Sequence, residues 1–253
     1  MGRYDRERNF LKSNFDSFKN IKTDKMKGIP QPEGVKPYDL NSIIIPLPNV
    51  HKDVLKKENI YECISSRRST RFYSEEEISL EELSYLLWAT QGITGTNNAG
   101  LTLRTVPCSG ATHSFETYLF VMNVAGIEKG IYRYLPVEHS LLLMFELKDI
   151  DKKVDAITLE QPFVPNFAKK AAVTFAWSTT PYRSEWKYDI TGHKKILIDI
   201  GHVCQNLYLS GESVEIGVCA IGIYDQAAID NLLQLDGDDE FIIYLAAAGK
   251  KRS

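Results

Sequence analysis

Three arginines and two hydroxyl residues follow one another in the run Arg67-Arg68-Ser69-Thr70-Arg71. A guanidinium presents a fork of N–H donors that matches a phosphate ester, and a neighbouring hydroxyl adds a neutral donor. The same composition is also typical of a solvated basic turn on a protein surface. The run is therefore a candidate phosphate site, with a surface turn as the open alternative.

A second basic run, Lys250-Lys251-Arg252, lies at the C-terminal end of the sequence, just after Gly249. Alone, it is typical of a solvated basic tail. If the fold brings it to the arginine run, the two runs could hold one anionic group together. The sequence leaves both interpretations open.

Two segments of small residues could approach a planar ligand through their backbone N–H groups. The first is Pro107-Cys108-Ser109-Gly110-Ala111, although a plain turn that leads into a strand explains it equally well. The second is predicted as an apolar loop bounded by glycines, or else a buried connector, and comprises Gly217, Val218, Cys219, Ala220, Ile221 and Gly222. Both segments are candidates for contact with an aromatic ring.

The pair Lys187-Tyr188 follows Trp186 in a segment that the sequence predicts as a polar loop. Either side chain can act as an acid or a base where burial shifts its pKa. The pair is therefore a candidate catalytic pair. The alternative is an ordinary surface position, since adjacent residues on a surface loop usually have no chemical role.

Hydrophobic periodicity predicts the elements that must position these residues. Ser79 and Glu82 have the spacing of a capping box and begin a predicted helix near 80–90, which a loop at 92–100 follows. A long amphipathic helix over 196–207 and a shorter one that begins at Asp225 are expected later in the chain. Strands are predicted over 118–124, 131–134, 141–147, 172–177 and 241–247. This mixture predicts an α+β fold with a mainly antiparallel central sheet packed with helices.

Length and composition predict one substantial core. The chain has 253 residues, of which 43% are hydrophobic and 25% are charged. Residues 1–56 are polar and interrupted by prolines, which predicts an extended arm, with a partly disordered leader as the alternative. One catalytic domain is expected over 57–253.

Charge, cysteine usage and missing motifs exclude several classes of protein. The net charge of −3 and the pI near 6.0 argue against a surface built to hold nucleic acid. Four dispersed cysteines, with no signal peptide and no apolar span, favour a cytoplasmic protein without a membrane partner. The five histidines form no metal-ligand motif, and the motifs of serine hydrolases, P-loop proteins and Rossmann folds are missing. No catalytic metal is expected.

Taken in order, these pieces resemble the nitroreductase superfamily, and most closely its SagB-type dehydrogenase branch, which includes the azoline oxidases that form thiazole and oxazole rings. The resemblance covers nearly the whole chain. It rests on the arginine run, the turn at 107–111 and further motifs, namely Ile45-Pro46-Leu47-Pro48, Leu86-Leu87-Trp88-Ala89-Thr90-Gln91-Gly92-Ile93, Glu116-Thr117-Tyr118, Gly130-Ile131-Tyr132-Arg133-Tyr134, Asp199-Ile200-Gly201-His202, Gln205-Asn206-Leu207-Tyr208-Leu209 and Ala220-Ile221-Gly222. Each motif is weak alone, whereas the ordered set is specific.

The resemblance implies FMN bound in a cleft at the interface of an intertwined homodimer with a nitroreductase-like fold. By motif, the residues that would hold the phosphate or ribityl chain are Arg67, Arg68 and Ser69, with Lys250 and Arg252 closing on the phosphate. Arg71 would lie near the flavin N1 and C2 carbonyl, where a fixed cation stabilises the charge of the reduced ring.

The same resemblance assigns the two small-residue segments to the flavin ring. The ring would be flanked by Pro107, Cys108, Ser109 and Gly110 and covered by Ala220, Ile221 and Gly222. Cys108 stands where the family commonly has serine, and a thiol is a poor hydrogen-bond donor, so only its backbone is expected to contact the flavin.

Three functions follow as hypotheses. The first is hydride transfer by a ping-pong mechanism from NAD(P)H to a nitro, quinone or similar small acceptor. The alternative is an azoline dehydrogenase acting on a modified peptide, because Lys187 and Tyr188 match the Lys-Tyr pair of that branch, whereas residues 189–194 depart from its usual continuation. The third, from another class, is a flavin-binding protein without turnover.

Overall fold

The structure is a computed structural model that describes residues 2–13, 18–98, 100–159 and 167–252. Within these residues, seven strands form one antiparallel sheet in the order β1-β6-β5-β4-β7-β9-β8, with β4 at its centre. The predicted antiparallel sheet is therefore confirmed. The strands are β1 (Ile44–Pro46), β4 (Phe115–Val121), β5 (Gly130–Leu135), β6 (Ser140–Glu146), β7 (Val173–Thr179), β8 (Ile216–Ile221) and β9 (Phe241–Lys250).

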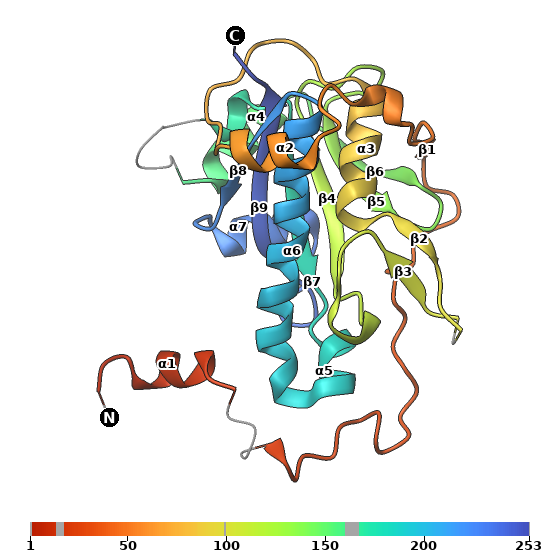
Figure 1. Cartoon of the computed structure of the whole chain (residues 1–253), viewed down its shortest axis with the longest axis vertical. Helices are drawn as coiled ribbons and strands as arrows, with labels where there is room; N and C mark the ends of the chain where they lie inside the picture. The colour runs from red at the N-terminus through yellow and green to blue at the C-terminus, as the bar shows by residue number, and fades with distance from the viewer. Residues whose placement is uncertain (1, 14–17, 99, 160–166, 253) are drawn as a thin grey trace.

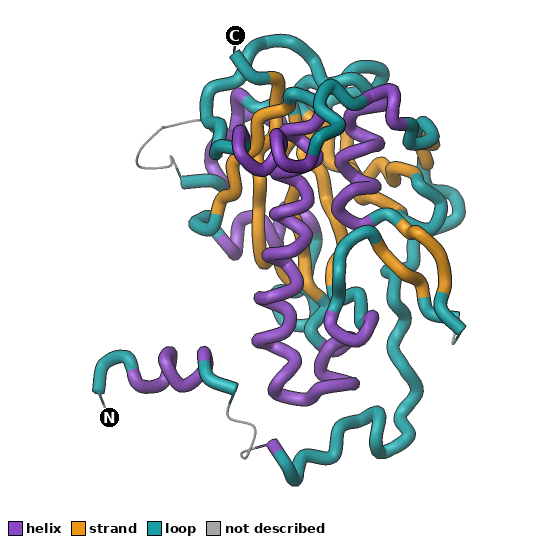
Figure 2. The backbone as a smooth tube through the Cα atoms, viewed as in Figure 1, coloured by secondary structure: helices purple, strands orange, loops and turns teal. Residues whose placement is uncertain are grey.

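Helices cover both faces of this sheet and enclose two apolar cores (Figure 1). Consecutive residues of β4 alternate between the cores, because side chains of a strand point to opposite faces in turn. Leu119 packs in one core, whereas Tyr118 and Phe120 pack in the other. The first face carries α2 (Ile60–Ser66), α3 (Leu80–Gln91) and α6 (Gly192–Ser213), and the second carries α4 (Ile150–Ile157) and α7 (Gln226–Leu233) (Figure 2).

The three predicted helices are confirmed, and two of them begin with the expected capping contacts. Ser79 Oγ accepts a hydrogen bond from Glu82 N at 3.2 Å, and Glu82 Oε2 accepts one from Ser79 N at 2.9 Å. Asp225 Oδ1 caps α7 by accepting from Ala228 N at 3.0 Å. The third helix, α6, has 22 residues and therefore extends about 33 Å along the sheet. Among the described helices, none combines the length and apolar character that crossing a membrane requires.

Two segments predicted as loops contain strands instead. Residues 92–100 include β2 (Ile93–Thr96), which pairs with β3 (Thr102–Arg104) as a small separate sheet. Residues 217–222 belong mostly to β8, whose partner is β9. Glycine marks close packing there, since a Cβ on Gly217 would lie 2.5 Å from the Thr70 side chain.

The predicted polar loop around Trp186 is also wrong, because residues 182–188 form the helix α5 (Tyr182–Tyr188). This short helix is held by the N-terminal segment. Trp186 Nε1 donates to Ile29 O at 2.8 Å, and Lys25 N donates to Trp186 O at 2.9 Å. Tertiary contacts therefore stabilise a helix that is too short to form alone.

The N-terminal segment is only partly separate from the domain. Its first helix, α1 (Asp5–Leu11), has no buried residue and stands off the body (Figure 1). Lys36, in contrast, is held inside the domain, where its Nζ lies 2.6 Å from Glu240 Oε2 and its backbone N donates to Glu116 Oε1 at 2.8 Å. The later part of the predicted arm is thus built into the fold, up to the edge strand β1.

Candidate active site

The arginine run lies between the end of α2 and the edge strand β8, and Tyr208 of α6 stands against it. The Arg67 guanidinium lies 5.3 Å from the centroid of the Tyr208 ring. The Tyr208 hydroxyl lies 3.1 Å from Ser69 Oγ and accepts a hydrogen bond from Ala220 N at 2.8 Å. Tyr208 therefore brings together three of the predicted site residues, Arg67, Ser69 and Ala220.

The arginines of the run make no ion pair with a carboxylate in the part of the chain that the structure describes. Arg68 donates to the carbonyl oxygens of Ser65 and Arg67, at 3.0 and 2.8 Å. Arg71 is exposed, and its guanidinium lies 6.0 Å from the centroid of the Phe167 ring. Guanidiniums without acidic partners are groups that a bound anion would stabilise.

The C-terminal run reaches the same region, but its side chains diverge. Lys251 pairs with Tyr73 as a β-bridge, which lays the end of β9 beside the segment that follows the arginine run. Arg252 Nε donates to Tyr73 O at 2.8 Å. Lys250, in contrast, is bonded to Glu82 Oε1 at 2.5 Å, at the start of α3. Within the C-terminal run, Arg252 is therefore the residue whose side chain has no carboxylate partner among the described residues.

Glu212 of α6 ties β9 to α2. Its Oε1 accepts from Lys57 Nζ at 2.5 Å and from Ser66 Oγ at 2.7 Å, and its Oε2 accepts from Lys251 Nζ at 2.5 Å. Burial raises the pKa of this carboxyl, but the hydrogen bonds from the three partners outweigh burial and lower its pKa to about 2. The ion pairs thus stabilise the framework behind the arginine run.

Replacing Glu212 by glutamine is expected to lower the free energy of unfolding by about 3 kcal/mol at neutral pH, because two lysines lose a buried partner. The folded pKa lies below the ordinary value of 4.5, so this stabilisation is complete above pH 4.5 and is lost as the pH falls towards 2. Urea unfolding at several pH values should show the difference shrinking over that window. A difference in unfolding free energy that stays constant with pH would contradict the role of the Glu212 carboxylate. Glu146→Gln, at an exposed position, is the control.

The turn at 107–111 lies beside the first half of α6. Asp199 holds Ser109 with both carboxylate oxygens, since Oδ2 accepts from the backbone N at 2.8 Å and Oδ1 from Oγ at 3.0 Å. Cys108 Sγ accepts from His113 N at 3.3 Å, which leaves the thiol engaged within the turn. Pro107 and Gly110 are exposed, so the turn presents backbone to solvent.

Lys187 and Tyr188 of α5 converge on Gly110 of this turn. Lys187 Nζ donates to Gly110 O at 2.8 Å. A Cβ on Gly110 would lie 2.2 Å from Tyr188 Oη and 2.5 Å from Lys187 Nζ, and its φ is +61°. Both the backbone conformation and the close approach require glycine here. The structure therefore brings the predicted catalytic pair to the predicted flavin-contacting turn.

The pKa values of the pair shift in opposite directions. Burial lowers the pKa of Lys187, and the positive charge of Lys25 lowers it further. Burial raises the pKa of Tyr188, and the neighbouring Cys108 and Asp199 side chains act in the same direction. Tyr188 therefore keeps its proton at neutral pH and can donate it, whereas Lys187 gives up its proton more readily than an ordinary lysine.

Within one chain, the two groups of site residues lie on opposite sides of α6. Tyr208 contacts the arginine run, and Asp199 contacts the turn. These two residues are separated by about two and a half helical turns, or about 14 Å, so their side chains leave opposite sides of the helix. Ile221 is buried in β8, and Gly222 is exposed just beyond the end of that strand.

Sequence reasoning assigned no role to Tyr208, Asp199 or Glu212, which organise both groups. The available signal for Asp199 was a carboxylate on the buried stripe of a predicted amphipathic helix, between Ile196 and Ile200. A buried carboxylate requires partners. Within the described ranges, no group of three or more His, Cys, Asp or Glu side chains is arranged to hold a metal ion.

Comparison with known proteins agrees with this architecture. A protein of Methanocaldococcus jannaschii named as a nitroreductase is 28% identical over 207 residues, which are 82% of this chain and 96% of that protein. The crystal structure of a protein of Anabaena variabilis, also named as a nitroreductase, has a TM-score of 0.68 and 23% identity over 83% of this chain. The chain spans only 42% of that protein's length.

A third similar structure is the E. coli microcin synthetase McbBCD complex with truncated pro-MccB17 bound. It has a TM-score of 0.59 and 14% identity over 98% of this chain and 86% of the matched chain, and at this identity the likeness is one of fold. Residues 64–250, from the end of α2 to the end of β9, match the Nitroreductase family as a whole. That match covers the arginine run, the turn, α5, α6 and nearly the whole sheet, and it shows that the chain belongs to the Nitroreductase family.

Proposed function

We propose that the chain is an FMN-dependent oxidoreductase that passes hydride by a ping-pong mechanism from NAD(P)H to a nitro, quinone or similar small acceptor. The observation that carries this proposal is the group of arginines without carboxylate partners beside Ser69 and Tyr208. Basic side chains with no internal counter-charge favour an anionic ligand, and a flavin mononucleotide ends in a phosphate.

The donor set fits that phosphate. Arg67 and Ser69 would hold it, and Arg68, exposed at the same turn, adds positive charge. Since Lys250 is bonded to Glu82, we assign the closing contact to Arg252. When bound, FMN supplies the hydride-accepting ring, and the protein supplies orientation and electrostatics.

A homodimer would complete the site. The arginine run and the turn at 107–111 lie on opposite sides of α6, so a flavin held by the run of one copy would meet the turn of a second copy. Exposed apolar side chains of α2 and α6, which cover the same face of the sheet, support such an interface. They are Ile60, Tyr61 and Ile64 of α2 and Leu197 of α6, each at least 50% exposed.

Arg71→Ala is expected to lower the reduction potential of the bound flavin by about 30 mV, because a fixed cation near N1 stabilises the reduced ring. Photoreduction in the presence of a redox dye measures this potential. An unchanged potential would place Arg71 away from the ring. Lys170→Ala removes a positive charge outside both groups of site residues and serves as the control.

Steady-state kinetics test the proposed reaction. Under anaerobic conditions, the FMN-loaded protein should oxidise more than one equivalent of NADH or NADPH per flavin only when an acceptor such as nitrofurazone or menadione is present. Parallel double-reciprocal plots should indicate the ping-pong order. Failure of both nucleotides with every acceptor, despite bound flavin, would reject the reductase assignment.

The second candidate is a SagB-type azoline dehydrogenase that removes two hydrogens from a thiazoline or oxazoline ring of a modified peptide and passes the electrons to oxygen. The convergence of Lys187 and Tyr188 on Gly110 favours it, since a base and a proton donor then lie at the predicted flavin-contacting turn. Incubation of the loaded protein with a thiazoline-containing peptide in air tests it. Mass spectrometry should show loss of two hydrogens, and an unchanged mass would exclude this activity.

A further inference from the structure

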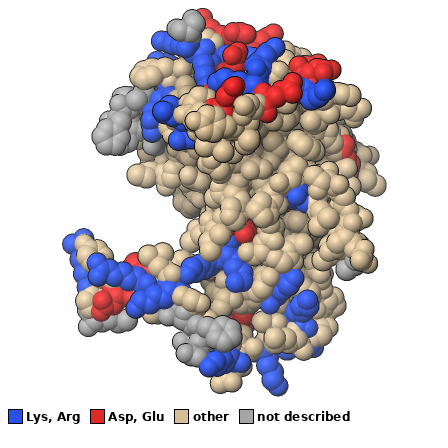
Figure 3. Space-filling view, viewed as in Figure 1, with Lys and Arg blue, Asp and Glu red and all other residues tan. Residues whose placement is uncertain are grey.

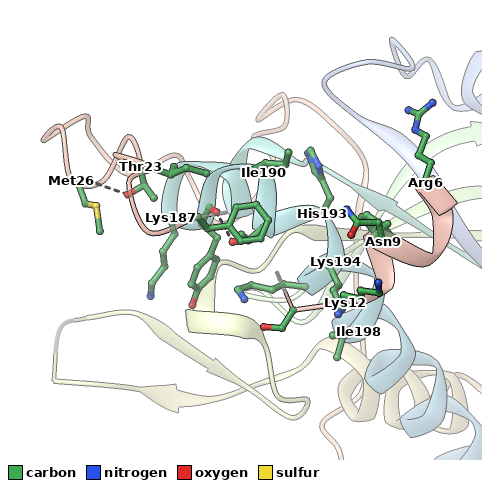
Figure 4. Close-up of a pocket in the computed structure, with 17 residues that line it drawn as sticks. Arg6, Asn9, Lys12, Thr23, Met26, Lys187, Ile190, His193, Lys194 and Ile198 are labelled. Carbon is green, nitrogen blue, oxygen red and sulfur yellow. Dashed lines mark hydrogen bonds between the residues drawn. The ribbon is translucent and has the colours of Figure 1, made fainter. Parts of the chain in front are cut away.

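A cavity of about 820 Å³ opens between the N-terminal segment, α5 and the start of α6 (Figure 4). Its volume is that of a binding site for a whole small molecule. Lys187 and Tyr188, the pair that converges on Gly110, belong to its wall. The cavity is therefore continuous with the candidate catalytic pair.

The wall made by the N-terminal segment is fixed to the domain. Lys25 N donates to Trp186 O at 2.9 Å, and Asp24 Oδ2 accepts from Tyr182 Oη at 2.9 Å. Lys194 Nζ donates to Leu11 O, at the end of α1. These hydrogen bonds join Leu11, Asp24 and Lys25 to α5 and α6, so described residues of the N-terminal segment on two sides of the cavity are linked to the domain.

The cavity is strongly cationic. Among its described lining residues, none is Asp or Glu, whereas six are basic: Arg6, Lys12, Lys187, His193, Lys194 and Lys195. Three acids lie nearby: Glu185 lies 2.6 Å from His193 Nε2, Asp24 is bonded to Lys27 and Tyr182, and Asp189 Oδ1 accepts from Ile190 N at 2.7 Å. Lys and Arg side chains gather along α1 and on the neighbouring surface of the body (Figure 3). A negative charge in the cavity would be stabilised.

The remaining lining is largely apolar. Phe10, Phe18, Ile21 and Met26 come from the N-terminal segment, and Ile190 and Ile198 face them from the domain. Such a surface binds the apolar body of a ligand, while a few charged groups fix its orientation.

From this charge pattern and lining we infer that the cavity binds an organic anion with an aromatic or apolar body, such as a carboxylated aromatic compound. Bound there, the carboxylate would lie near Lys12 and Lys194, and the apolar body would extend along Ile190 towards Lys187, as the positions of these side chains in Figure 4 allow. Tyr188 lines the same end of the cavity as Lys187. Its role as the acceptor pocket rests on the proposed function, whereas the binding itself does not.

The test compares two matched compounds, 4-nitrobenzoate and the neutral 4-nitrobenzamide, with the FMN-loaded protein and no hydride donor. Ligand-observed NMR titration gives both dissociation constants. The carboxylate is expected to bind about tenfold more tightly than the amide. In the double variant Lys12→Gln, Lys194→Gln, the preference should fall to about twofold. The hydrogen bonds of Asp24 with Tyr182 and of Lys25 with Trp186 are untouched in this variant, so residues 24 and 25 of the N-terminal segment remain held.

Lys152→Gln, on the exposed side of α4, removes the same charge elsewhere and should leave the preference unchanged. Equal affinity for the two compounds, or a preference that survives in the double variant, would overturn the inference. The titrations measure binding without a hydride donor, so they remain interpretable even if the protein reduces none of the acceptors. A preference for the anion in a protein that reduces no acceptor would support the cavity and reject the proposed reaction.

Discussion

Arg67→Ala is expected to weaken FMN binding about 100-fold, since a bidentate charge-assisted contact to a phosphate contributes about 3 kcal/mol. In the structure, the Arg67 guanidinium packs against Tyr208, beside Ser69, and has no carboxylate partner among the described residues. Its charge is therefore available to a ligand. Dialysis followed by the flavin absorbance of the retained protein measures the loss, and a fluorescence titration gives the affinity.

Arg68→Ala is the matched control for this change. One nitrogen of the Arg68 guanidinium already donates to two backbone carbonyls, so its removal should weaken FMN binding only about threefold. Flavin retention that is equal in Arg67→Ala and the unaltered protein would refute the phosphate site. Equal losses in both variants would instead indicate a diffuse effect of positive charge.

Tyr188→Phe is expected to lower kcat/KM for the acceptor about 100-fold, the usual contribution of a positioned proton donor. Burial raises the pKa of this phenol, so it holds a proton at neutral pH, and its hydroxyl adjoins Gly110. The rate at which NAD(P)H bleaches the bound flavin should stay within about twofold, because that half of the cycle uses no proton from Tyr188. Stopped-flow absorbance separates the two halves.

Tyr38→Phe provides the control, because it removes the same hydroxyl at a position that lines neither the turn nor the cavity. The Tyr38 hydroxyl bonds to Glu138 Oε1, 3.2 Å away, in the turn between β5 and β6. Its loss should leave both half-reactions unchanged. If Tyr188→Phe reduced the acceptor as fast as the unaltered protein, the proton would come from another source, and Tyr188 would be a structural residue.

Elements with a local cause could be predicted from the sequence. Ser79 and Glu82 cap α3 through bonds that depend only on residues three positions apart. The stripe that includes Ile196 and Leu207 likewise follows from helical periodicity and is buried in α6 as expected.

Elements that depend on distant partners could not be predicted. The glycines that bound the segment 217–222 are typical of a loop, and only the pairing of β8 with β9 selects a strand there. Helix α5 has seven residues, too few to be stable alone, and depends on the contact of Trp186 with Ile29. Neither the pairing of β8 with β9 nor the contact of Trp186 with Ile29 can be inferred from local propensity.

The same limit applies to the site. Residue types identified the arginine run, the turn and the pair Lys187-Tyr188, because their chemistry is visible in a short window. The sequence could not say that Lys250 bonds to Glu82, or that Tyr208 and Asp199 organise opposite sides of α6. Such choices of partner follow from packing across the whole chain.

An anaerobic absorbance spectrum of the purified protein, recorded before and after adding NADH and then NADPH, shows whether the protein holds a flavin that a nicotinamide reduces. An FMN-dependent reductase should show flavin bands at about 450 nm that bleach with at least one nucleotide. Bands that persist with both nucleotides would contradict the reductase function and favour the azoline dehydrogenase or a flavin-binding protein without turnover. A protein that takes up no flavin even after incubation with FMN would contradict the assignment of the arginine run itself.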